Sequence, residues 1–444
     1  MGKRIGIISL GCAKNLVNTE QMMYLLEQAG YEVSGETEGA DAVIVNTCGF
    51  IDAAKSEAID VILELAEAKA AGSVGRIIVT GCLPQRYQDE VLRELPEVDA
   101  VCGTGSYGQI VSVCDRVLAG ETVKEFGDLD APEREGGRVL TTSPLWEYIK
   151  IAEGCSNYCA FCIIPYIRGR YRSRPMDELV REAEGLAAQG IRELIVIAQD
   201  ITRYGRERGE TLAELLRRFC RIDGIRWIRL HYLYPDDITD ELIDLVASEP
   251  KICKYLDIPI QHINDGILKT MCRRGTGGEI RELFAKLRSR IPGLVLRTSL
   301  IAGLPGEGEE EFEELCAFLK EARIERAGVF PYSPEEGTPA EKMDRPDEQT
   351  AQRRAESIAA LQERIMDEFD RSRIGTEVTV LVEEFDGKVY SGRSYAESPD
   401  IDGRIRFTSE ETITGDFARV TITGVVDGEP FGCGVPDEEE RKTV

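Results

Sequence analysis

The strongest constraint on the fold is an alternation of apolar strand-like segments and helical segments that runs through most of the 444 residues. In residues 1–120 the helical segments 15–28 and 53–71 each end at a glycine, as helices commonly do. The strand candidates around them are residues 3–10, 42–46, 76–80 and 98–101. Alternation of this kind favours a parallel sheet with helices on both faces, so we expect residues 1–120 to form an α/β domain.

A second alternating region begins near residue 144 and has six strand candidates, residues 148–152, 193–198, 227–233, 255–260, 294–301 and 327–332. Six β/α units are too few for a complete eight-unit barrel. They fit an open (β/α)6 barrel whose mouth lies at the carboxyl ends of the strands. The charged amphipathic segment 352–369 is expected to be a connecting helix, so that this domain covers residues 144–374.

Two further stretches differ in character from these domains. Residues 121–143 are polar and contain Pro132 and Gly136-Gly137, which favours a linker or a short hairpin. Residues 375–444 contain short alternating strands, at 378–382, 404–408 and 418–425, separated by Gly and Asp turns. This length and pattern fit a small all-β barrel of five strands.

Three cysteines at C-x-x-x-C-x-x-C spacing, Cys155, Cys159 and Cys162, directly follow the strand candidate 148–152. Three thiolates on one loop can bind three corners of a four-iron cluster and leave the fourth iron open for chemistry. Zinc is the alternative, but it needs a fourth ligand nearby, commonly another cysteine or a histidine. The two histidines, His231 and His262, are distant in sequence, so the spacing favours an iron–sulfur cluster.

Three more cysteines follow strand candidates of the first domain. Cys12, Cys48 and Cys82 come just after the first three of them. Because the carboxyl ends of parallel strands lie together, we expect these side chains to meet at one edge of the sheet. The alternative is that they are small buried apolar residues, which would place them inside the strands rather than at their ends. The pattern predicts a second cluster, again with one iron open.

Composition limits the surroundings in which the chain works. The sequence has no apolar run of 18 residues and no signal-peptide pattern at its start, so neither a membrane span nor export is expected. Thirteen cysteines then indicate a reducing, cytoplasmic compartment with thiols free or bound to metal. The net charge of −26 repels polyanions at long range and favours a basic partner.

The order of the three domains resembles the radical S-adenosylmethionine (SAM) methylthiotransferase family, and Phe161 before the third loop cysteine matches the radical SAM signature. The resemblance implies two [4Fe–4S] clusters, one on Cys12, Cys48 and Cys82 and one on Cys155, Cys159 and Cys162. It implies that one SAM methylates a cluster-bound sulfur, while a second supplies the radical that removes a substrate hydrogen. The methylthio group then joins the carbon radical. The terminal barrel resembles a TRAM domain, a substrate-recognition module.

Two branches of this family differ in substrate. One modifies tRNA adenosines, and the other modifies the β-carbon of an aspartate in a small-subunit ribosomal protein, protein S12. Segments 11–17, 162–165 and 392–403 resemble the second branch. Residues 375–444 carry 7 basic and 16 acidic residues, a net charge of −9, which suits a basic ribosomal protein better than tRNA. The tRNA branch and a non-catalytic metal-binding protein remain the alternatives; an electron donor is expected as a second partner.

The SAM pocket of such a barrel is expected at the strand ends, where polar groups suit the ribose and methionine ends of SAM. Gln199, Asp200, Gln261 and Arg297 are the predicted contacts, and His262 is either a further contact or a capping or core residue. No catalytic residue is predicted beyond the cluster ligands.

Three other sequence features have weaker interpretations. The arginines Arg168, Arg170, Arg172 and Arg174 would share one face of an extended segment, either as a solvated charged strip or as groups that hold SAM, a substrate carboxylate or the domain interface, and none is assigned a role. The G-x-G-x-x-G match over residues 103–108 is interpreted as a turn into the helix 109–118 rather than a dinucleotide site. The remaining cysteines, with no shared spacing, are interpreted as buried apolar residues: Cys102, Cys114, Cys220, Cys253, Cys272, Cys316 and Cys433.

Overall fold

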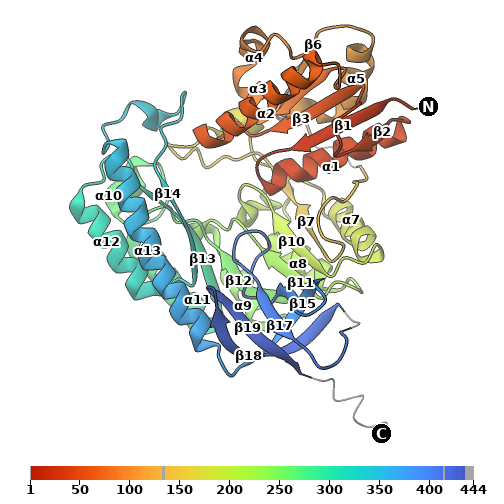
Figure 1. Cartoon of the computed structure of the whole chain (residues 1–444). Helices are drawn as coiled ribbons and strands as arrows, with labels where there is room; N and C mark the ends of the chain where they lie inside the picture. Colours follow the sequence, from red (N-terminus) through yellow and green to blue (C-terminus); the bar gives the residue numbers. More distant parts are fainter. Residues whose placement is uncertain (1, 133–135, 414–415, 436–444) are drawn as a thin grey trace.

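The computed structural model describes residues 2–132, 136–413 and 416–435 (Figure 1). Its N-terminal part is a parallel sheet in the order β2-β1-β3-β4-β5-β6. The strands are β1 Arg4–Ser9, β2 Glu32–Ser34, β3 Ala42–Thr47, β4 Ile77–Gly81, β5 Ala100–Cys102 and β6 Val123–Glu125. The helices are α1 Ala13–Gln28, α2 Asp52–Ala70, α3 Cys82–Tyr87, α4 Asp89–Glu94 and α5 Ile110–Leu118. One apolar core packs α1 and α5 on one face, and another packs α2 on the other, which confirms the expected layers.

The second sheet is parallel and open, in the order β14-β13-β12-β11-β10-β7. Its strands are β7 Trp146–Lys150, β10 Glu193–Ile197, β11 Trp227–Leu230, β12 Ile252–Asp257, β13 Val295–Ala302 and β14 Arg326–Pro331. A short antiparallel pair, β8 Ala152–Glu153 and β9 Arg172–Ser173, flanks the first strand. The helices are α6 Ile164–Arg168, α7 Met176–Ala188, α8 Leu212–Cys220, α9 Asp240–Ser248, α10 Asp265–Thr270, α11 Gly277–Arg290 and α12 Glu309–Ala322. The expected partial barrel is confirmed.

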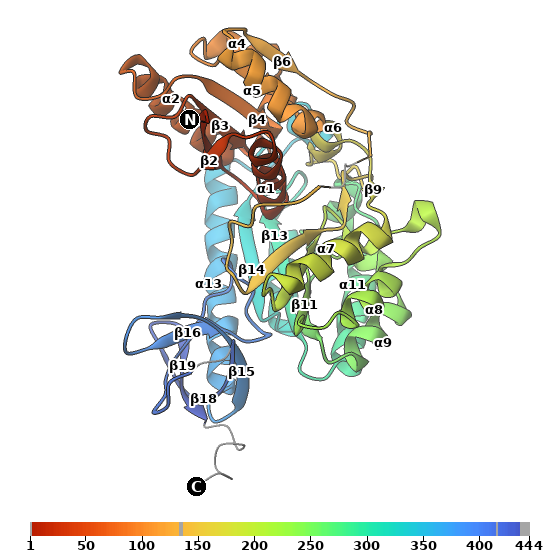
Figure 2. The same cartoon turned by 90° about the vertical axis from the view of Figure 1, so that its right-hand side faces the viewer.

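Helix α13, Glu348–Ser372, leads from the open barrel to a small closed barrel, as Figure 2 shows. The closed barrel has the strand order β15-β16-β17-β19-β18, and its expected five strands are confirmed. They are β15 Glu377–Phe385, β16 Tyr390–Arg393, β17 Ile405–Thr408, β18 Phe417–Val426 and β19 Glu429–Val435. No helix in the described residues is both long and apolar enough to cross a bilayer.

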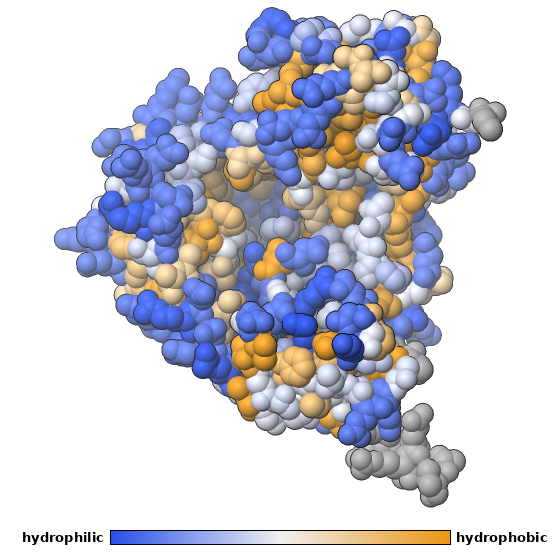
Figure 3. Space-filling model, viewed as in Figure 1, coloured by the Kyte–Doolittle hydropathy of each residue, from blue (hydrophilic) through white to orange (hydrophobic). Residues whose placement is uncertain are grey.

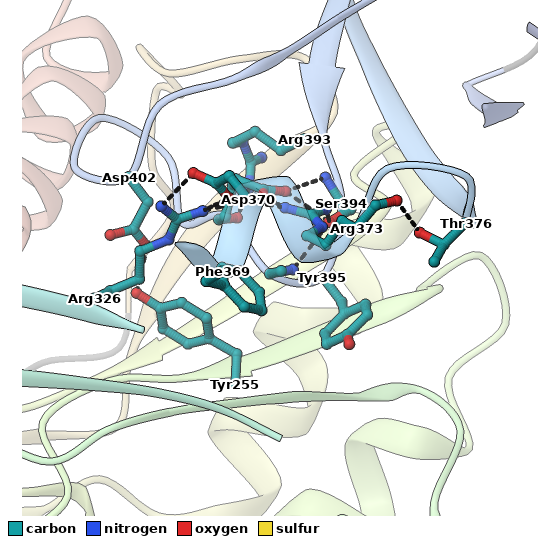
Figure 4. Close-up of polar contacts among 12 residues, drawn as sticks. Tyr255, Arg326, Phe369, Asp370, Arg373, Thr376, Arg393, Ser394, Tyr395 and Asp402 are labelled. Atoms are coloured by element: carbon teal, nitrogen blue, oxygen red, sulfur yellow. Dashed lines mark hydrogen bonds and ion pairs between the residues drawn. The ribbon is translucent and has the colours of Figure 1, made fainter. Parts of the chain in front are cut away.

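The loop that joins β16 to β17, residues 394–404, packs against the open barrel, where it contacts His231 after β11, Tyr255 of β12 and Arg297 of β13. Ser394, Glu397 and Ser398 are fully buried there. Arg393, at the start of this loop, pairs with Glu193 of β10 at 2.8 Å. Figure 4 shows Arg326, Arg373 and Arg393 gathered around the loop, with Asp370 of α13 beside them. Breaking one partner of such a buried ionic network leaves a charge without compensation, so the network fixes how the small barrel docks.

Some boundaries differ from the expectation. The sequence patterns do not predict β2, β6, β9, β16 and β19, and β6 lies within residues 121–143, the segment expected to be a linker. It is three residues long and alternates little, so only its pairing with β5 identifies it. The division of the chain into domains at 120, 143 and 374 stays a proposal. In the face seen in Figure 3 the surface is hollowed between the N-terminal domain and the two barrels below it.

Candidate functional site

The first cysteine group, called the N-terminal trio, consists of Cys12, Cys48 and Cys82. These residues follow β1, β3 and β4, and those neighbouring strands are paired so that their carboxyl ends are level. The backbone just before Cys12 lies close to Cys48, because a Cβ placed on Gly11 would lie 2.8 Å from the Cβ of Cys48. Gly11 also has a φ of +92°, which only glycine adopts readily. The fold therefore brings together three cysteines from distant parts of the sequence.

The three thiols of the N-terminal trio influence one another electrostatically. Burial raises the pKa of Cys48 to about 11, and the neighbouring Cys82 and Cys12 add to the rise. Burial likewise raises the pKa of Cys82, against the opposing charge of Arg168. Burial also acts to raise the pKa of Cys12, but Lys14 and Arg168 outweigh it, so that this pKa is lowered. Because a metal binds the thiolate form, coordination here would release protons and depend on pH.

The second group, called the loop trio, consists of Cys155, Cys159 and Cys162 between β8 and α6. Burial raises the pKa of Cys155 to about 11, with Cys159 as a neighbouring charge. Burial also raises the pKa of Cys162, and Cys159 and Cys155 contribute. Arg273 comes from the segment after α10 and donates a hydrogen bond of 3.7 Å to the Sγ atom of Cys159. Hydrogen bonds to cluster sulfurs are one means by which proteins set reduction potentials.

The two trios lie next to each other across the domain boundary. Cys82 packs in one apolar group with Ile163 and Ile167, and Ile163 directly follows Cys162. Arg168, at the end of α6, is buried, and its Nη1 atom lies 2.9 Å from Oε2 of Glu153. The same side chain donates to Asn15 (3.1 Å) in the first turns of α1. Arg168 thus joins the N-terminal trio to the strand that leads into the loop trio.

Glu153, just before the loop trio, is the centre of this buried network. Its carboxylate accepts hydrogen bonds from Lys150 (2.7 Å), Gln199 (2.7 Å) and Arg168. Burial would raise its pKa, but the charges of Arg168 and Lys150 outweigh burial and hold the pKa well below its usual range. Glu153 is therefore an ionised carboxylate that positions the loop rather than a general acid.

Each donor set consists of cysteines alone, which fits the ligand type of iron–sulfur clusters. Within the described ranges, no three His, Cys, Asp or Glu side chains stand close enough to hold one metal ion. A cluster spaces its cysteines farther apart, because each sulfur binds a different iron. Neither histidine supplies a fourth zinc ligand: His231 is hydrogen-bonded to Ser398 at 2.9 Å, and Nε2 of His262 lies 3.3 Å from Glu307. His262 is fully buried, as its core interpretation predicted.

The predicted SAM contacts occupy different environments. Gln199 is the best placed, because its Oε1 atom is buried without a hydrogen-bond partner beside Glu153, so it could accept a hydrogen bond from a bound ligand. Asp200 already accepts a hydrogen bond of 2.9 Å from Asn157 of the cysteine loop. Gln261 has a φ of +69° and forms an isolated bridge to Leu300 at the strand ends.

The charge of Arg297 is compensated by carboxylates of the protein, so it needs no ligand. It pairs with Asp257 at 2.9 Å and lies 3.9 Å from Asp402 of the loop 394–404. That loop belongs to the small barrel, so both carboxylates beside Arg297 come from the protein's own packing. SAM contacts at Gln199, Asp200, Gln261 and Arg297 stay predictions.

Two weaker expectations are wrong. The four arginines do not share a face: Arg168 ends a helix and is buried, whereas Arg170 is 78% exposed. Gly169 between them has a φ of +74°, which interrupts an extended segment. Among the remaining cysteines, Cys272 and Cys433 are exposed rather than buried. The interpretation of residues 103–108 as a turn is confirmed by the short 3-10 helix over Thr104–Gln109.

Sequence reasoning missed the roles of Glu153 and Arg273. Glu153 had a usable signal, since it directly precedes Gly154 and the first loop cysteine. Arg273 had none, because it lies more than a hundred residues from the cysteine to which it donates.

Comparison with known families agrees with this geometry. Residues 4–103 match the uncharacterized protein family UPF0004, residues 149–319 match the radical SAM superfamily, and residues 374–429 match the TRAM domain. The superfamily match implies an iron–sulfur cluster and SAM as cofactors. Among solved structures, the radical SAM methyltransferase TsrM of Kitasatospora setae has a TM-score of 0.55 at 16% identity, covering 77% of each chain, which shows a shared fold.

Curated relatives match along nearly the whole chain. The ribosomal protein uS12 methylthiotransferase RimO of Pelobacter propionicus is 50% identical over 438 residues, covering 97% of both chains. The enzyme of the same name from Desulforudis audaxviator is 48% identical over 426 residues, covering 95% of this chain and 94% of the relative. With this identity across all three regions, the chain belongs to the RimO family of radical SAM methylthiotransferases.

Proposed function

We propose that this enzyme adds a methylthio group to the β-carbon of an aspartate in ribosomal protein uS12, using two SAM molecules per turnover. The loop trio would hold the [4Fe–4S] cluster that binds SAM, and the N-terminal trio would hold a second one. The observation that carries the proposal is the proximity of the trios, shown by the packing of Cys82 against Ile163, the residue after Cys162. Two clusters held there would face one common space.

Bound at these positions, the clusters and SAM would supply the sulfur, the methyl group and the radical that removes the substrate hydrogen. The protein's own part is positioning. Glu153 and Arg168 fix the two trios relative to each other, and Arg273 donates to Cys159. The unpartnered Oε1 atom of Gln199 lies beside Glu153 and is available to an N–H or O–H group of SAM. No side chain in this set needs to act as a general base.

Charge supports a protein substrate. The small barrel is acidic, with a net charge of −9 over residues 375–444, and opposite charge speeds encounter with a basic ribosomal protein. An RNA partner would instead need basic side chains for its phosphates. An electron donor and a cytoplasmic setting go with this proposal.

Mass spectrometry of cells with and without this chain tests the proposal. We expect uS12 to lose a methylthio group on one aspartate when the chain is absent, while the thiomethylated adenosines of tRNA are unchanged. If the tRNA modification is lost and uS12 is unchanged, the chain modifies tRNA adenosines and the proposal is wrong. Zinc without iron in the purified protein, and no SAM cleavage under reductant, would favour a binding protein.

A further inference from the structure

Lys14 is a buried cation that has no acidic partner in the part of the chain that the structure describes. It lies in the first turn of α1, two residues after Cys12, and is only 8% exposed. Its Nζ atom lies 3.3 Å from the ring centroid of Tyr232, in the segment that follows β11 at the mouth of the open barrel. No Asp or Glu of residues 2–132, 136–413 and 416–435 forms an ion pair with it. Buried lysines are otherwise almost always paired.

The groups around Lys14 add positive potential and do not compensate the charge of its side chain. The first turn of α1 contains no acidic residue, and no side chain caps the helix, so its N-terminal N–H groups also favour an anion. The pKa of the neighbouring His231 lies well below its usual range. The main cause is burial, and the positive charges of Arg229, Arg297 and Lys14 add to it. A buried ammonium facing only an aromatic ring is costly unless a bound anion completes the site.

We propose that Lys14 binds the carboxylate of the substrate aspartate in the space between the two trios. This inference rests on the proposed function, in which the reacting β-carbon is bonded directly to that carboxylate carbon. Lys14 reaches this space from the N-terminal domain and contacts Tyr232 of the open barrel. An ion pair there would hold the β-carbon beside the N-terminal trio and reject a neutral side chain of the same shape.

Two other roles for Lys14 use the same charge. It could balance the thiolate of Cys12, whose pKa it helps to lower once burial has been overcome. It could instead bind the carboxylate of SAM. Neither of these two roles would make the enzyme bind an aspartate substrate more tightly than an asparagine one. A preference for aspartate that depends on Lys14 therefore identifies substrate binding.

The test compares binding of two peptides to the reconstituted enzyme, one spanning the target aspartate of uS12 and one with asparagine in its place. In fluorescence anisotropy the wild type should bind the aspartate peptide at least about 10-fold more tightly, the range of a charged hydrogen bond. Lys14→Met should bring this ratio close to one, and Lys14→Arg should keep most of it. Lys124→Met, which removes an exposed lysine paired with Asp89 in the same domain, should behave as wild type.

Iron content, the electron paramagnetic resonance (EPR) spectrum and the Kd for SAM are measured on the same samples and should not change in Lys14→Met. An unchanged peptide ratio in this variant overturns the inference. If the ratio persists, a weaker SAM Kd assigns Lys14 to SAM, and lost iron assigns it to the cluster. If Lys14→Met does not take up iron, the two peptides are compared on Lys14→Gln, which also lacks the positive charge. Methylthiolation of uS12 by the wild type is scored separately, so failure of the proposed function is recognised on its own.

Discussion

The two cysteine trios are assembled in opposite ways. The loop trio lies within eight residues, between Cys155 and Cys162, and needs only one loop to form. The N-terminal trio spans 71 residues, from Cys12 to Cys82, and exists only when three parallel strands are paired in register. Local spacing therefore determines the first site, whereas tertiary structure determines the second. The loop trio should tolerate loosening of the N-terminal domain, and the N-terminal trio should not.

The largest expected effect separates the chemistry of the trios. Cys159→Ala should abolish reductive SAM cleavage, because it would remove one of the three proposed ligands of the SAM-binding cluster. Cys48→Ala should leave SAM cleavage within about twofold of wild type and abolish methylthio transfer, since it would damage only the proposed second cluster. Both are measured by chromatography of 5′-deoxyadenosine and by mass of the modified peptide. Methylthio transfer by Cys48→Ala would contradict the assigned division of labour.

The next effect concerns the link between the trios. Arg168→Met leaves the buried Glu153 carboxylate short of a partner, and breaking such a buried pair typically costs about 3–5 kcal/mol. Urea unfolding followed by circular dichroism should show this loss. Arg170→Met, a change at a 78% exposed position two residues away, should stay within about 0.5 kcal/mol of wild type. Equal behaviour of the two variants would exclude Arg168 as the link.

Docking of the N-terminal domain should depend on pH through Glu147 of β7. Glu147 and Glu20 of α1 share Arg138, at 2.8 Å and 3.0 Å. Burial, opposed by Arg138 and assisted by Glu20, raises the pKa of Glu147 to about 7. The folded state therefore holds a proton that the unfolded state releases, so stability is lost as pH rises from about 5 through 7.

Glu147→Gln should remove this slope and be more stable than wild type at pH 8, but not at pH 5. Thermal unfolding midpoints across this range test it. Glu184→Gln, at an exposed position on α7, is the control and should keep the wild-type slope. A wild-type slope in Glu147→Gln would show that another group titrates.

A smaller effect is expected at the loop trio. Arg273→Gln removes the charged donor to Cys159, so the reduced cluster should be less stabilised. A loss of about 1 kcal/mol corresponds to a potential lower by about 40 mV for a one-electron couple. Potentiometric titration followed by EPR measures it. A potential within a few millivolts of wild type would mean that the hydrogen bond has no such role.

The smallest effect is expected at two exposed cysteines that belong to neither trio. Cys272→Ser and Cys433→Ser should keep wild-type iron content and activity, because both side chains are exposed and neither is one of the six proposed ligands, although Cys272 directly precedes Arg273. Iron loss in Cys272→Ser would add a ligand beyond the six proposed here.

Sequence reasoning predicted the two parallel sheets and the small barrel because their patterns are periodic over long stretches. It also predicted both trios, one from spacing and one from the rule that parallel strand ends converge. It missed β6, whose three residues carry little pattern. It also missed the roles of Lys14 and Arg273 and the burial of the loop 394–404, because each depends on a partner far away in the sequence. The contact of Lys14 with Tyr232 and that of Arg273 with Cys159 form only in the folded chain, so no local sequence pattern indicates them.

Quantification of iron and sulfide, with Mössbauer spectra, tests the central claim most directly. The anaerobically reconstituted wild type should contain eight irons per chain in two [4Fe–4S] clusters. A variant with alanine at Cys12, Cys48 and Cys82 should contain four, in a cluster that still cleaves SAM. Four irons in both proteins, or eight in the variant, would contradict the assignment of a separate cluster to each trio.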